Sequence, residues 1–441
     1  MKKTYYLASL GCAKNTVDSS SMAELLKKDG YRGTDDPALA SVLIVNTCGF
    51  IQAAREESLQ VLGELAQQKQ PGQWLIAAGC LTERYRELIT EKVQGVDGFI
   101  GTRRWMDILE LLSEMRRNPK TPQYHIPDVQ SVGRDEKGVL RASVQGTSAY
   151  LKIADGCRRL CAFCSIPLIK GTTVSRPLEL ILNEAETLQY QGVKELIIIA
   201  QDTTDYGYDL GMKDGLATLL EKMLPRIPEI PWLRLLYSFP GYVSDRLIDL
   251  MSDTPQVLHY FDIPLQHADP GLLKKMKRPS DIDWVYRTVE KMRARIPDLA
   301  IRSTFIVGYP GETEKEFNTL LKFLEEMQLD HVGAFTFSFE PGTTSESFGD
   351  PVSEEEKQER LRRLMKLQEA ISLKRNQALI GKKLDVLIEG EGDGISVGRS
   401  YRDAPEIDGL VIVNGVLPVG TIHPVLIAGA MTHDLTADIV K

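Results

Sequence analysis

Three cysteines in one short segment are the first residues whose type and spacing point to chemistry. Cys157, Cys161 and Cys164 lie within ADGCRRLCAFCSIP in the pattern C-x3-C-x2-C. Thiolates are preferred ligands of zinc and of iron–sulfur clusters. A [4Fe–4S] cluster held by three cysteines keeps one iron open for a small molecule. The alternatives are a zinc site that takes its fourth ligand from elsewhere in the chain, and three reduced core thiols.

The other three cysteines, Cys12, Cys48 and Cys80, are separated by 36 and 32 residues. Each ends an apolar run, in ASLGC, VNTC and AAGC, and each interval is about the length of one strand–helix unit. The carboxyl ends of parallel strands meet at one edge of a sheet, where ligands bind. We therefore expect three thiolates on one edge, again with an apparent vacancy. The alternative is three buried core cysteines, since free cysteine is often buried.

The elements around Cys12, Cys48 and Cys80 predict an open parallel α/β sheet. Residues 4–117 contain the apolar runs TYYLASLG, SVLIVNTCG, QWLIAAGC and VDGFIG. Helical patterns follow near 18–29, 53–68, 82–92 and 105–117. Short apolar runs that alternate with helices are typical of a parallel sheet. The start, MKKTYYLASLGC, is interpreted as the first strand of a cytoplasmic protein, because its apolar stretch is too short for a signal peptide.

A longer alternation begins near residue 150 and predicts a complete or partial parallel barrel. Its candidate strands are YLKIAD, ELIIIAQ, LRLLYS, YFDIPLQ, AIRSTFIVG and HVGAFTFS. Cys157, Cys161 and Cys164 follow the first of these strands, YLKIAD, at the mouth where parallel barrels carry their chemistry. Residues 381–441 contain the short runs KLDVLIEG, GLVIVN, GTIHPVLIAGA and DLTADIV with frequent glycines. They predict a small β-barrel.

These patterns divide the chain of 441 residues into three domains. We expect an α/β domain at 1–118, a linker at 119–143, the barrel-like core at 144–375 and the small β-barrel at 376–441. The composition, 43% hydrophobic and 26% charged, is ordinary for a soluble globular protein. A net charge of −8 does not favour broad nucleic-acid or membrane binding. Six cysteines are too few for a disulfide scaffold of this length.

At this point the sequence resembles a known family. CRRLCAFC is similar to the cysteine loop of radical S-adenosylmethionine enzymes. The three strand-end cysteines resemble the amino-terminal domain of the methylthiotransferases in that group, and the last domain resembles their TRAM domain. The stretches SYRDAPEIDG and LYSFPG resemble the branch that acts on a ribosomal protein. The tRNA-modifying branch, which usually carries a more basic stretch there, is the first alternative. A non-catalytic iron–sulfur or zinc protein is the second.

The resemblance implies a function and its cofactors. Members of this branch methylthiolate the β-carbon of an aspartate in small-subunit ribosomal protein twelve. S-adenosylmethionine acts as the methyl donor and as the source of a 5′-deoxyadenosyl radical. The resemblance implies a [4Fe–4S] cluster exchangeable with S-adenosylmethionine on Cys157, Cys161 and Cys164. It implies a second, sulfur-carrying cluster on Cys12, Cys48 and Cys80, and the two clusters would face one cavity. An electron donor and a sulfur source are implied partners.

Polar residues and glycines at other strand ends are candidate contacts for S-adenosylmethionine. Gln201 and Asp202 end the second core strand, where they could meet the amino group of the cofactor. Gly308 and Gly311 follow the fifth strand and could admit adenosine through close backbone approach. Arg302 and Ser303 precede them and could meet the polar groups of the adenosine. Gln266 and His267 end the fourth strand, and His267 is either a substrate contact or a structural histidine. The candidates at the fifth strand are Arg302, Ser303, Gly308 and Gly311.

The charge of the last domain bears on the partner. Residues 376–441 contain nine acidic and five basic side chains, a net charge of −4. An RNA-binding module normally concentrates positive charge, whereas an acidic module attracts basic proteins. This balance favours a basic ribosomal protein over tRNA as the substrate. The alternative is that the acidic residues form an ordinary solvated surface.

Overall fold

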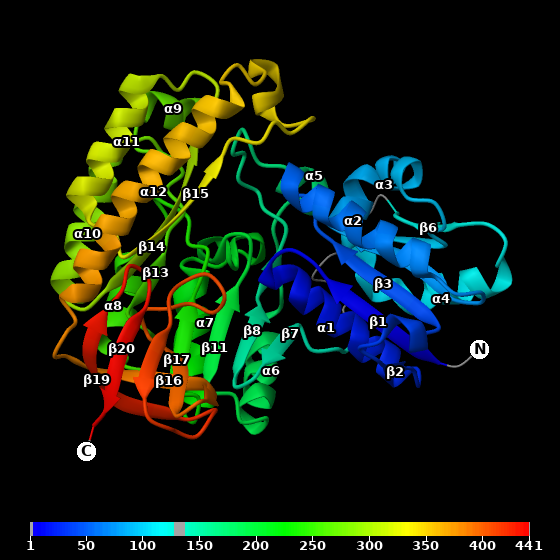
Figure 1. Ribbon diagram of the computed structural model, residues 1–441, viewed down its shortest axis with the longest axis horizontal. Coiled ribbons are helices and arrows are strands. Elements are labelled where there is room, and N and C mark those ends of the chain that lie inside the picture. Colours follow the sequence, from blue (N-terminus) through cyan, green and yellow to red (C-terminus); the bar gives the residue numbers. More distant parts are fainter. Residues whose placement is uncertain (1–2, 128–136, 441) are drawn as a thin grey trace.

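A computed structural model describes residues 3–127 and 137–440 in three parts (Figure 1). These parts are an amino-terminal α/β domain, a central core of strands and helices, and a carboxy-terminal β-barrel. The expected linker at 119–143 lies partly outside the described residues, and its described part contains a short strand. Among the described helices, none has the length and apolar character needed to cross a membrane.

The amino-terminal domain is a parallel open sheet with helices packed against it, as the alternating pattern predicted. The strand order is β2-β1-β3-β4-β5-β6 and every described pairing in it is parallel. Two short polar edge strands, β2 and β6, were missed because they carry no apolar run. The strands are β1 (Thr4–Ser9), β2 (Arg32–Gly33), β3 (Val42–Thr47), β4 (Trp74–Gly79), β5 (Gly98–Gly101) and β6 (Gln123–His125). The helices are α1 (Ala13–Lys28), α2 (Gln52–Gln68), α3 (Cys80–Lys92) and α4 (Ile108–Arg117).

Helix α1 begins five residues earlier than the periodicity indicates, at Ala13 instead of residue 18. Its first turns, AKNTVDSSS, are almost entirely polar, so no apolar period marks them. Even so, Asn15, Asp18 and Ser21 are buried. The Asn15 side chain is satisfied within its own domain, where it donates to the Leu10 carbonyl at 2.9 Å. Asp18 and Ser21 bond to residues beyond that domain; for example, the Ser21 hydroxyl donates to the Leu140 carbonyl at 2.7 Å. This helix therefore joins the first two domains through polar contacts.

The core contains six parallel strands, which confirms the predicted partial barrel. They form two hydrogen-bonded groups, β12-β11-β8-β7 and β13-β14-β15, in which β7 is an added antiparallel edge strand. The break between β12 and β13 is bridged by backbone bonds, such as Ser238 N–H to the Asp262 carbonyl at 3.0 Å. The core strands are β7 (Ala142–Gln145), β8 (Ser148–Lys152), β9 (Ala154–Asp155), β10 (Val174–Ser175), β11 (Glu195–Ile199), β12 (Trp232–Leu235), β13 (Tyr260–Asp262), β14 (Ala300–Val307) and β15 (His331–Thr336).

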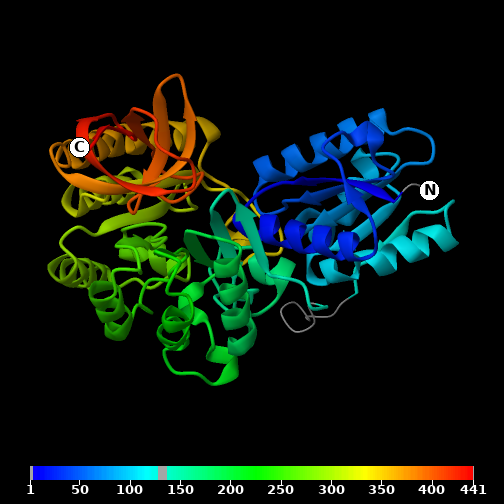
Figure 2. The ribbon, with the colours of Figure 1, turned by 90° about the horizontal axis from the view of Figure 1, so that it is seen from below.

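Helices follow most of these strands and cover the outside of the partial barrel (Figures 1 and 2). A single apolar core joins the strands to the covering helices, with Leu196, Ile198 and Phe305 among its fully buried members. The long charged helix α12 closes the region, as its leucine spacing predicted. The helices are α5 (Ile166–Lys170), α6 (Leu178–Tyr190), α7 (Gly215–Met223), α8 (Asp245–Asp253), α9 (Pro270–Lys275), α10 (Ile282–Arg295), α11 (Glu314–Met327) and α12 (Glu354–Gln377).

The carboxy-terminal domain is a closed five-stranded barrel, as predicted, in the order β16-β17-β18-β20-β19. Four of its strands match the apolar runs. The fifth strand, β17, has the sequence ISVGRS. It was missed because serine, glycine and arginine interrupt its apolar residues. The strands are β16 (Lys383–Gly392), β17 (Ile395–Ser400), β18 (Val411–Asn414), β19 (Ile422–Ala430) and β20 (Leu435–Ile439).

This barrel packs against the core (Figures 1 and 2). The contact between them contains buried charges. Arg399 of β17 lies 2.6 Å from Glu195, the first residue of β11. Asp408 accepts a 2.6 Å hydrogen bond from the hydroxyl of Tyr260, the first residue of β13. The RDAPEID stretch therefore lies at the amino-terminal ends of core strands, the end opposite the cysteine loop. In this protein the stretch serves domain docking.

Candidate functional site

Cys12, Cys48 and Cys80 lie where their positions after apolar runs predicted. Strands β1, β3 and β4 are neighbours in the sheet, and each cysteine follows the carboxyl end of one of them. Cys12 caps the start of α1, Cys48 follows β3 directly, and Cys80 is the first residue of α3. The three side chains therefore share one sheet edge.

A glycine beside each of these cysteines is required by close packing. Gly11 has a φ of +93°, and a Cβ there would lie 3.0 Å from the Sγ of Cys48. Gly79 has a φ of +95°, and its Cβ would lie 2.3 Å from the Asn46 Oδ1. Positive φ angles and such approaches favour glycine. The Gly–Cys pairs are thus local requirements for bringing three chain segments to one point.

The second triad lies on a loop fixed by backbone hydrogen bonds. Cys157 N–H donates to the Gly171 carbonyl at 3.0 Å, and Cys164 N–H donates to the Cys161 carbonyl at 3.1 Å. Between them, Ala162 N–H donates to the Met276 carbonyl at 2.8 Å, which ties the loop to the end of α9. The loop follows β9, at the carboxyl-terminal mouth of the partial barrel.

All six cysteines line one cavity of about 420 Å³. Its walls come from the amino-terminal sheet edge on one side and from the core loops on the other. Apolar side chains complete the lining; they are Phe50, Phe163, Ile166, Ile169, Phe239, Pro264 and Phe335. The structure thus brings together two triads that are separate in the sequence.

The spacing of the thiols argues against a mononuclear zinc site. Tetrahedral zinc with Zn–S bonds of about 2.3 Å places its sulfurs only about 3.8 Å apart. Among residues 3–127 and 137–440, one set of three ligand atoms lies within 4.8 Å of one another, and it contains no cysteine. A cluster in which each thiolate binds a different iron requires more widely spaced ligands. Six thiol donors around one cavity fit such clusters.

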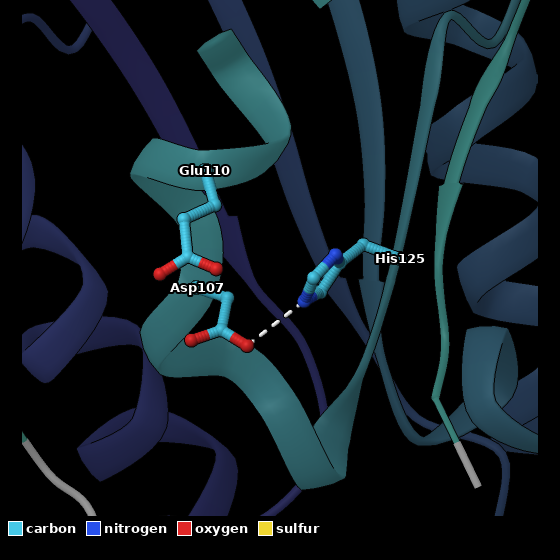
Figure 3. Close-up of side chains that lie close together, drawn as sticks. All are labelled: Asp107, Glu110 and His125. Atoms are coloured by element: carbon cyan, nitrogen blue, oxygen red, sulfur yellow. Dashed lines mark hydrogen bonds and ion pairs between the residues drawn. The ribbon is translucent and has the colours of Figure 1, made fainter. Parts of the chain in front are cut away.

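The compact set is Asp107, Glu110 and His125 (Figure 3). Asp107 already lies 2.8 Å from His125 Nε2, 2.9 Å from Lys137 Nζ and in contact with Arg104. Lys137 also pairs with Glu110 at 2.6 Å. Burial opposes ionisation, but these partners lower the pKa of Asp107 to about 2. Because the protein's own cations balance the carboxylates, we assign this group to the fold.

The cavity is electropositive. Among the residues that the structure describes, four cationic side chains line it and no aspartate or glutamate does. Arg278 lies 3.6 Å from the Cys161 Sγ through Nη1. Positive charge around thiols favours their anionic, metal-binding form. The four cations are Lys14, Arg159, Lys170 and Arg278.

The thiols differ in how readily they ionise. Burial raises the pKa of Cys80 and of Cys157 to about 12. Cys12 is exposed to the cavity. Desolvation by the surrounding protein opposes its ionisation, but the Lys14 ammonium and the Asn15 N–H bring its pKa below the usual value. The positive charge of a bound metal would offset the cost of burial and convert the buried thiols to thiolates.

The structure separates the candidate cofactor contacts into two groups. Gln201 and Gln266 line the cavity. Asp202 does not; its carboxylate lies 2.7 Å from Arg159 Nε, which itself lines the cavity. Asp202 can therefore act through Arg159 as a positioning residue. His267 is fully buried, accepts a hydrogen bond from Asp269 N–H at 2.9 Å and lies 3.3 Å from Glu312, which favours the structural interpretation.

The candidates at β14 do not line the cavity. Arg302 lies 3.3 Å from Asp408 in the interface with the carboxy-terminal barrel. Ser303 donates to the Ile263 carbonyl at 2.9 Å, a strand-to-strand contact. Gly308 and Gly311 accommodate lysine side chains instead, because a Cβ at either would lie 2.4 Å from Lys357 Cγ or Lys275 Nζ.

Several cavity residues were missed by the sequence analysis. Lys14 and Asn15 lie two and three residues after Cys12, so their closeness to a candidate ligand was an available signal. Lys170, Tyr237 and Arg278 reach the cavity only through the folding of the core loops. Lys170 ends the short helix α5, and Tyr237 and Arg278 follow β12 and α9. Their types and spacing in the sequence do not show that these three segments meet.

Comparison with known families gives the same three-part division. Residues 4–101 match the model described as uncharacterized protein family UPF0004, residues 151–324 match the radical SAM superfamily, and residues 380–440 match the TRAM domain. The chain is 47% identical to the ribosomal protein uS12 methylthiotransferase RimO of Chloroflexus aurantiacus, over 98% of both chains. It is 41% identical to the protein of the same name from Geobacter sulfurreducens, over 100% of this chain and 99% of that one.

The chain belongs to the ribosomal protein uS12 methylthiotransferase family. Among solved structures, this family member is similar to the radical S-adenosylmethionine methyltransferase TsrM from Kitasatospora setae, which was solved with cobalamin and a [4Fe–4S] cluster bound. The TM-score is 0.56 at 15% identity, covering 78% of this chain and 77% of that chain. That likeness supports the fold, and family membership rests on the full-length relatives.

Proposed function

We propose that this protein attaches a methylthio group to the β-carbon of an aspartate in ribosomal protein uS12. S-adenosylmethionine would serve both as the methyl donor and as the source of the radical. The observation that carries the proposal is that all six cysteines line one electropositive cavity. The names of the full-length relatives support the choice of substrate protein.

The two triads would hold two [4Fe–4S] clusters. Cys157, Cys161 and Cys164 would hold the cluster that binds S-adenosylmethionine, with Gln201 and Arg159 beside it. The amino-terminal triad would hold the second cluster. When bound, these groups supply abstraction of hydrogen from an unactivated carbon and a sulfur that can be methylated and transferred. The protein brings the two sites together and excludes water with the aromatic side chains of the cavity.

The proposed partner is a basic ribosomal protein. Of the nine acidic and five basic side chains in residues 376–441, Asp403, Asp408, Arg399 and Arg402 are buried. Leaving out these two acidic and two basic side chains does not change the net charge. The acidic excess therefore belongs to side chains outside the domain interface. An acidic surface favours a basic protein over RNA. The proposed reaction also requires an electron donor and a sulfur source, and a ribosomal substrate supports a cytoplasmic location.

The test is a comparison of substrates. The anaerobically reconstituted enzyme is incubated with S-adenosylmethionine, a reductant and either uS12 or tRNA, and the products are analysed by mass spectrometry. We expect a methylthio increment on an aspartate of uS12. Product on tRNA alone would contradict the proposed substrate. Purification with zinc and without iron would contradict the radical reaction.

A further inference from the structure

Lys14 is a buried cation in the cavity that lacks a carboxylate partner. Its side chain is 8% exposed and lines the cavity two residues after Cys12. Within the described residues, no carboxylate oxygen lies within 4.0 Å of its ammonium group. Its contact is the face of the Tyr237 ring, whose centroid lies 3.1 Å from Nζ. A buried ammonium is costly when it is unpaired, so this position indicates a function.

Tyr237, whose ring contacts this ammonium, is held in a fixed position. Its backbone has a φ of +63°, a conformation that is strained for a tyrosine. Two backbone hydrogen bonds hold it: its N–H donates to Asp262 Oδ2 at 2.9 Å, and its carbonyl accepts from Thr203 N–H at 3.0 Å. A cation–π contact orients a lysine without neutralising its charge. Lys14 therefore remains available to an anion that enters the cavity.

The other cations of the cavity are engaged differently. Lys170 lies 3.1 Å from Asp18 and 3.2 Å from Asp155. Arg159 lies 2.7 Å from Asp202. Arg278 contacts Cys161 of the core loop and stacks over the Phe239 ring at 4.1 Å, which associates it with the core triad. Lys14 lies on the amino-terminal wall, where its ammonium also favours the anionic form of Cys12. Unlike Lys170 and Arg159, it has no carboxylate within 4.0 Å among the described residues.

We propose that Lys14 binds the carboxylate of the substrate aspartate. This inference rests on the proposed function and names the group that selects the target residue. In aspartate the carboxylate is bonded directly to the β-carbon, so holding it fixes the carbon that must react. Lys14 lies beside Cys12, on the wall that would carry the transferred sulfur. A neutral base such as adenine needs no cation at this point, whereas a buried carboxylate does.

The test measures binding as well as turnover. The variants are Lys14→Gln, Lys14→Arg and Lys27→Gln, the last an exposed lysine on the same helix. Each reconstituted enzyme is titrated with a labelled uS12 segment that carries the target aspartate, and with the same segment carrying asparagine. Iron content and 5′-deoxyadenosine formation are measured for every variant.

We expect the wild-type enzyme and Lys27→Gln to bind the aspartate segment about tenfold or more tightly than the asparagine segment. Lys14→Gln should lose this preference while keeping its iron and its 5′-deoxyadenosine formation, and Lys14→Arg should restore part of it. An unchanged preference in Lys14→Gln would overturn the carboxylate site. Loss of iron in Lys14→Gln would also overturn it, by assigning Lys14 to the second cluster. If the wild-type enzyme leaves uS12 unmodified, the proposed function itself fails.

Discussion

Lys152 of the core donates a 2.7 Å hydrogen bond to Asp18 of the amino-terminal domain, and both side chains are buried. Arg141 and Lys170 also contact Asp18, and Asp155 completes the cluster. Asp18 lies on α1, the helix that Cys12 caps, and Lys170 lines the cavity. This buried network therefore sets the position of one cysteine triad relative to the other.

Asp18→Asn should destabilise the protein strongly. Burial opposes ionisation of Asp18, but Lys152, Lys170 and Arg141 hold its pKa well below the ordinary value. Removing this charge leaves buried cations with less compensation, and we expect a loss of about 3–5 kcal/mol in the free energy of unfolding. Denaturant unfolding under anaerobic conditions measures it. Asp29→Asn is the control, since its pair with Lys3 is exposed and should contribute below about 1 kcal/mol. Equal effects would contradict the network.

Gly11→Ala should impair the amino-terminal cluster selectively. The new Cβ would lie 2.8 Å from the Cys48 Cβ. Gly30→Ala is a matched control, because Gly30 also has a positive φ, +82°, but nothing lies within 4 Å of its Cβ. Both variants should lose about 1–3 kcal/mol through backbone strain. Iron analysis should show about half of the iron lost in Gly11→Ala and none in Gly30→Ala. Full iron in Gly11→Ala would show that this packing is dispensable.

His259 should make stability depend on pH. Its Nδ1 lies 2.6 Å from Asp298, and this hydrogen bond raises the pKa of His259 above 6.5. A raised pKa in the folded state stabilises the protein below the unfolded pKa, and the effect disappears as the pH rises through the folded value. His259→Gln should therefore cost up to about 1 kcal/mol near pH 6 and almost nothing near pH 9. Thermal unfolding at both pH values tests this, and a cost that grows with pH would reverse the assignment.

Arg399→Ala should loosen the carboxy-terminal barrel. Arg399 pairs with Glu195 at 2.6 Å in a fully buried contact with the core. Its loss leaves the buried Glu195 carboxylate with Arg234 as its remaining cation among the described residues, and we expect a cost of about 3–5 kcal/mol. Limited proteolysis should then release the barrel. Lys383→Ala, an exposed change in the same domain, should leave the digestion pattern unchanged. An identical pattern for both variants would contradict the docking role.

The sequence predicts the three-part fold and the positions of the cysteines well, because both are marked by short-range signals. Apolar runs identify most strands, and a cysteine after three successive runs predicts one shared edge. The polar start of α1 was not predicted, since its buried side chains are polar: Asp18 and Ser21 bond to residues beyond their own domain, and Asn15 bonds to strand ends within it. Edge strands such as β6 lack apolar residues and depend on their neighbour for pairing.

The polar lining of the cavity was predictable only in part. Gln201 follows a strand, which marks it as a residue of the barrel mouth. Arg302 and Ser303 lie too early in β14, and the structure uses them for contacts with Asp408 and Ile263. Their strand was identified correctly, and so was the carboxyl end as the end that faces the cavity, but Arg302 and Ser303 are the third and fourth of the eight residues of β14. The role of RDAPEID was likewise hidden, because a docking contact and a recognition contact use the same residue types.

The central claim is that one cavity holds two iron–sulfur clusters on opposite walls. The most direct measurement is a crystal structure of the anaerobically reconstituted protein with anomalous diffraction recorded at the iron edge. We predict two separate iron peaks in the same cavity, one against Cys12, Cys48 and Cys80 and the other against Cys157, Cys161 and Cys164. A single iron peak, or a signal from zinc at either triad, would contradict the account.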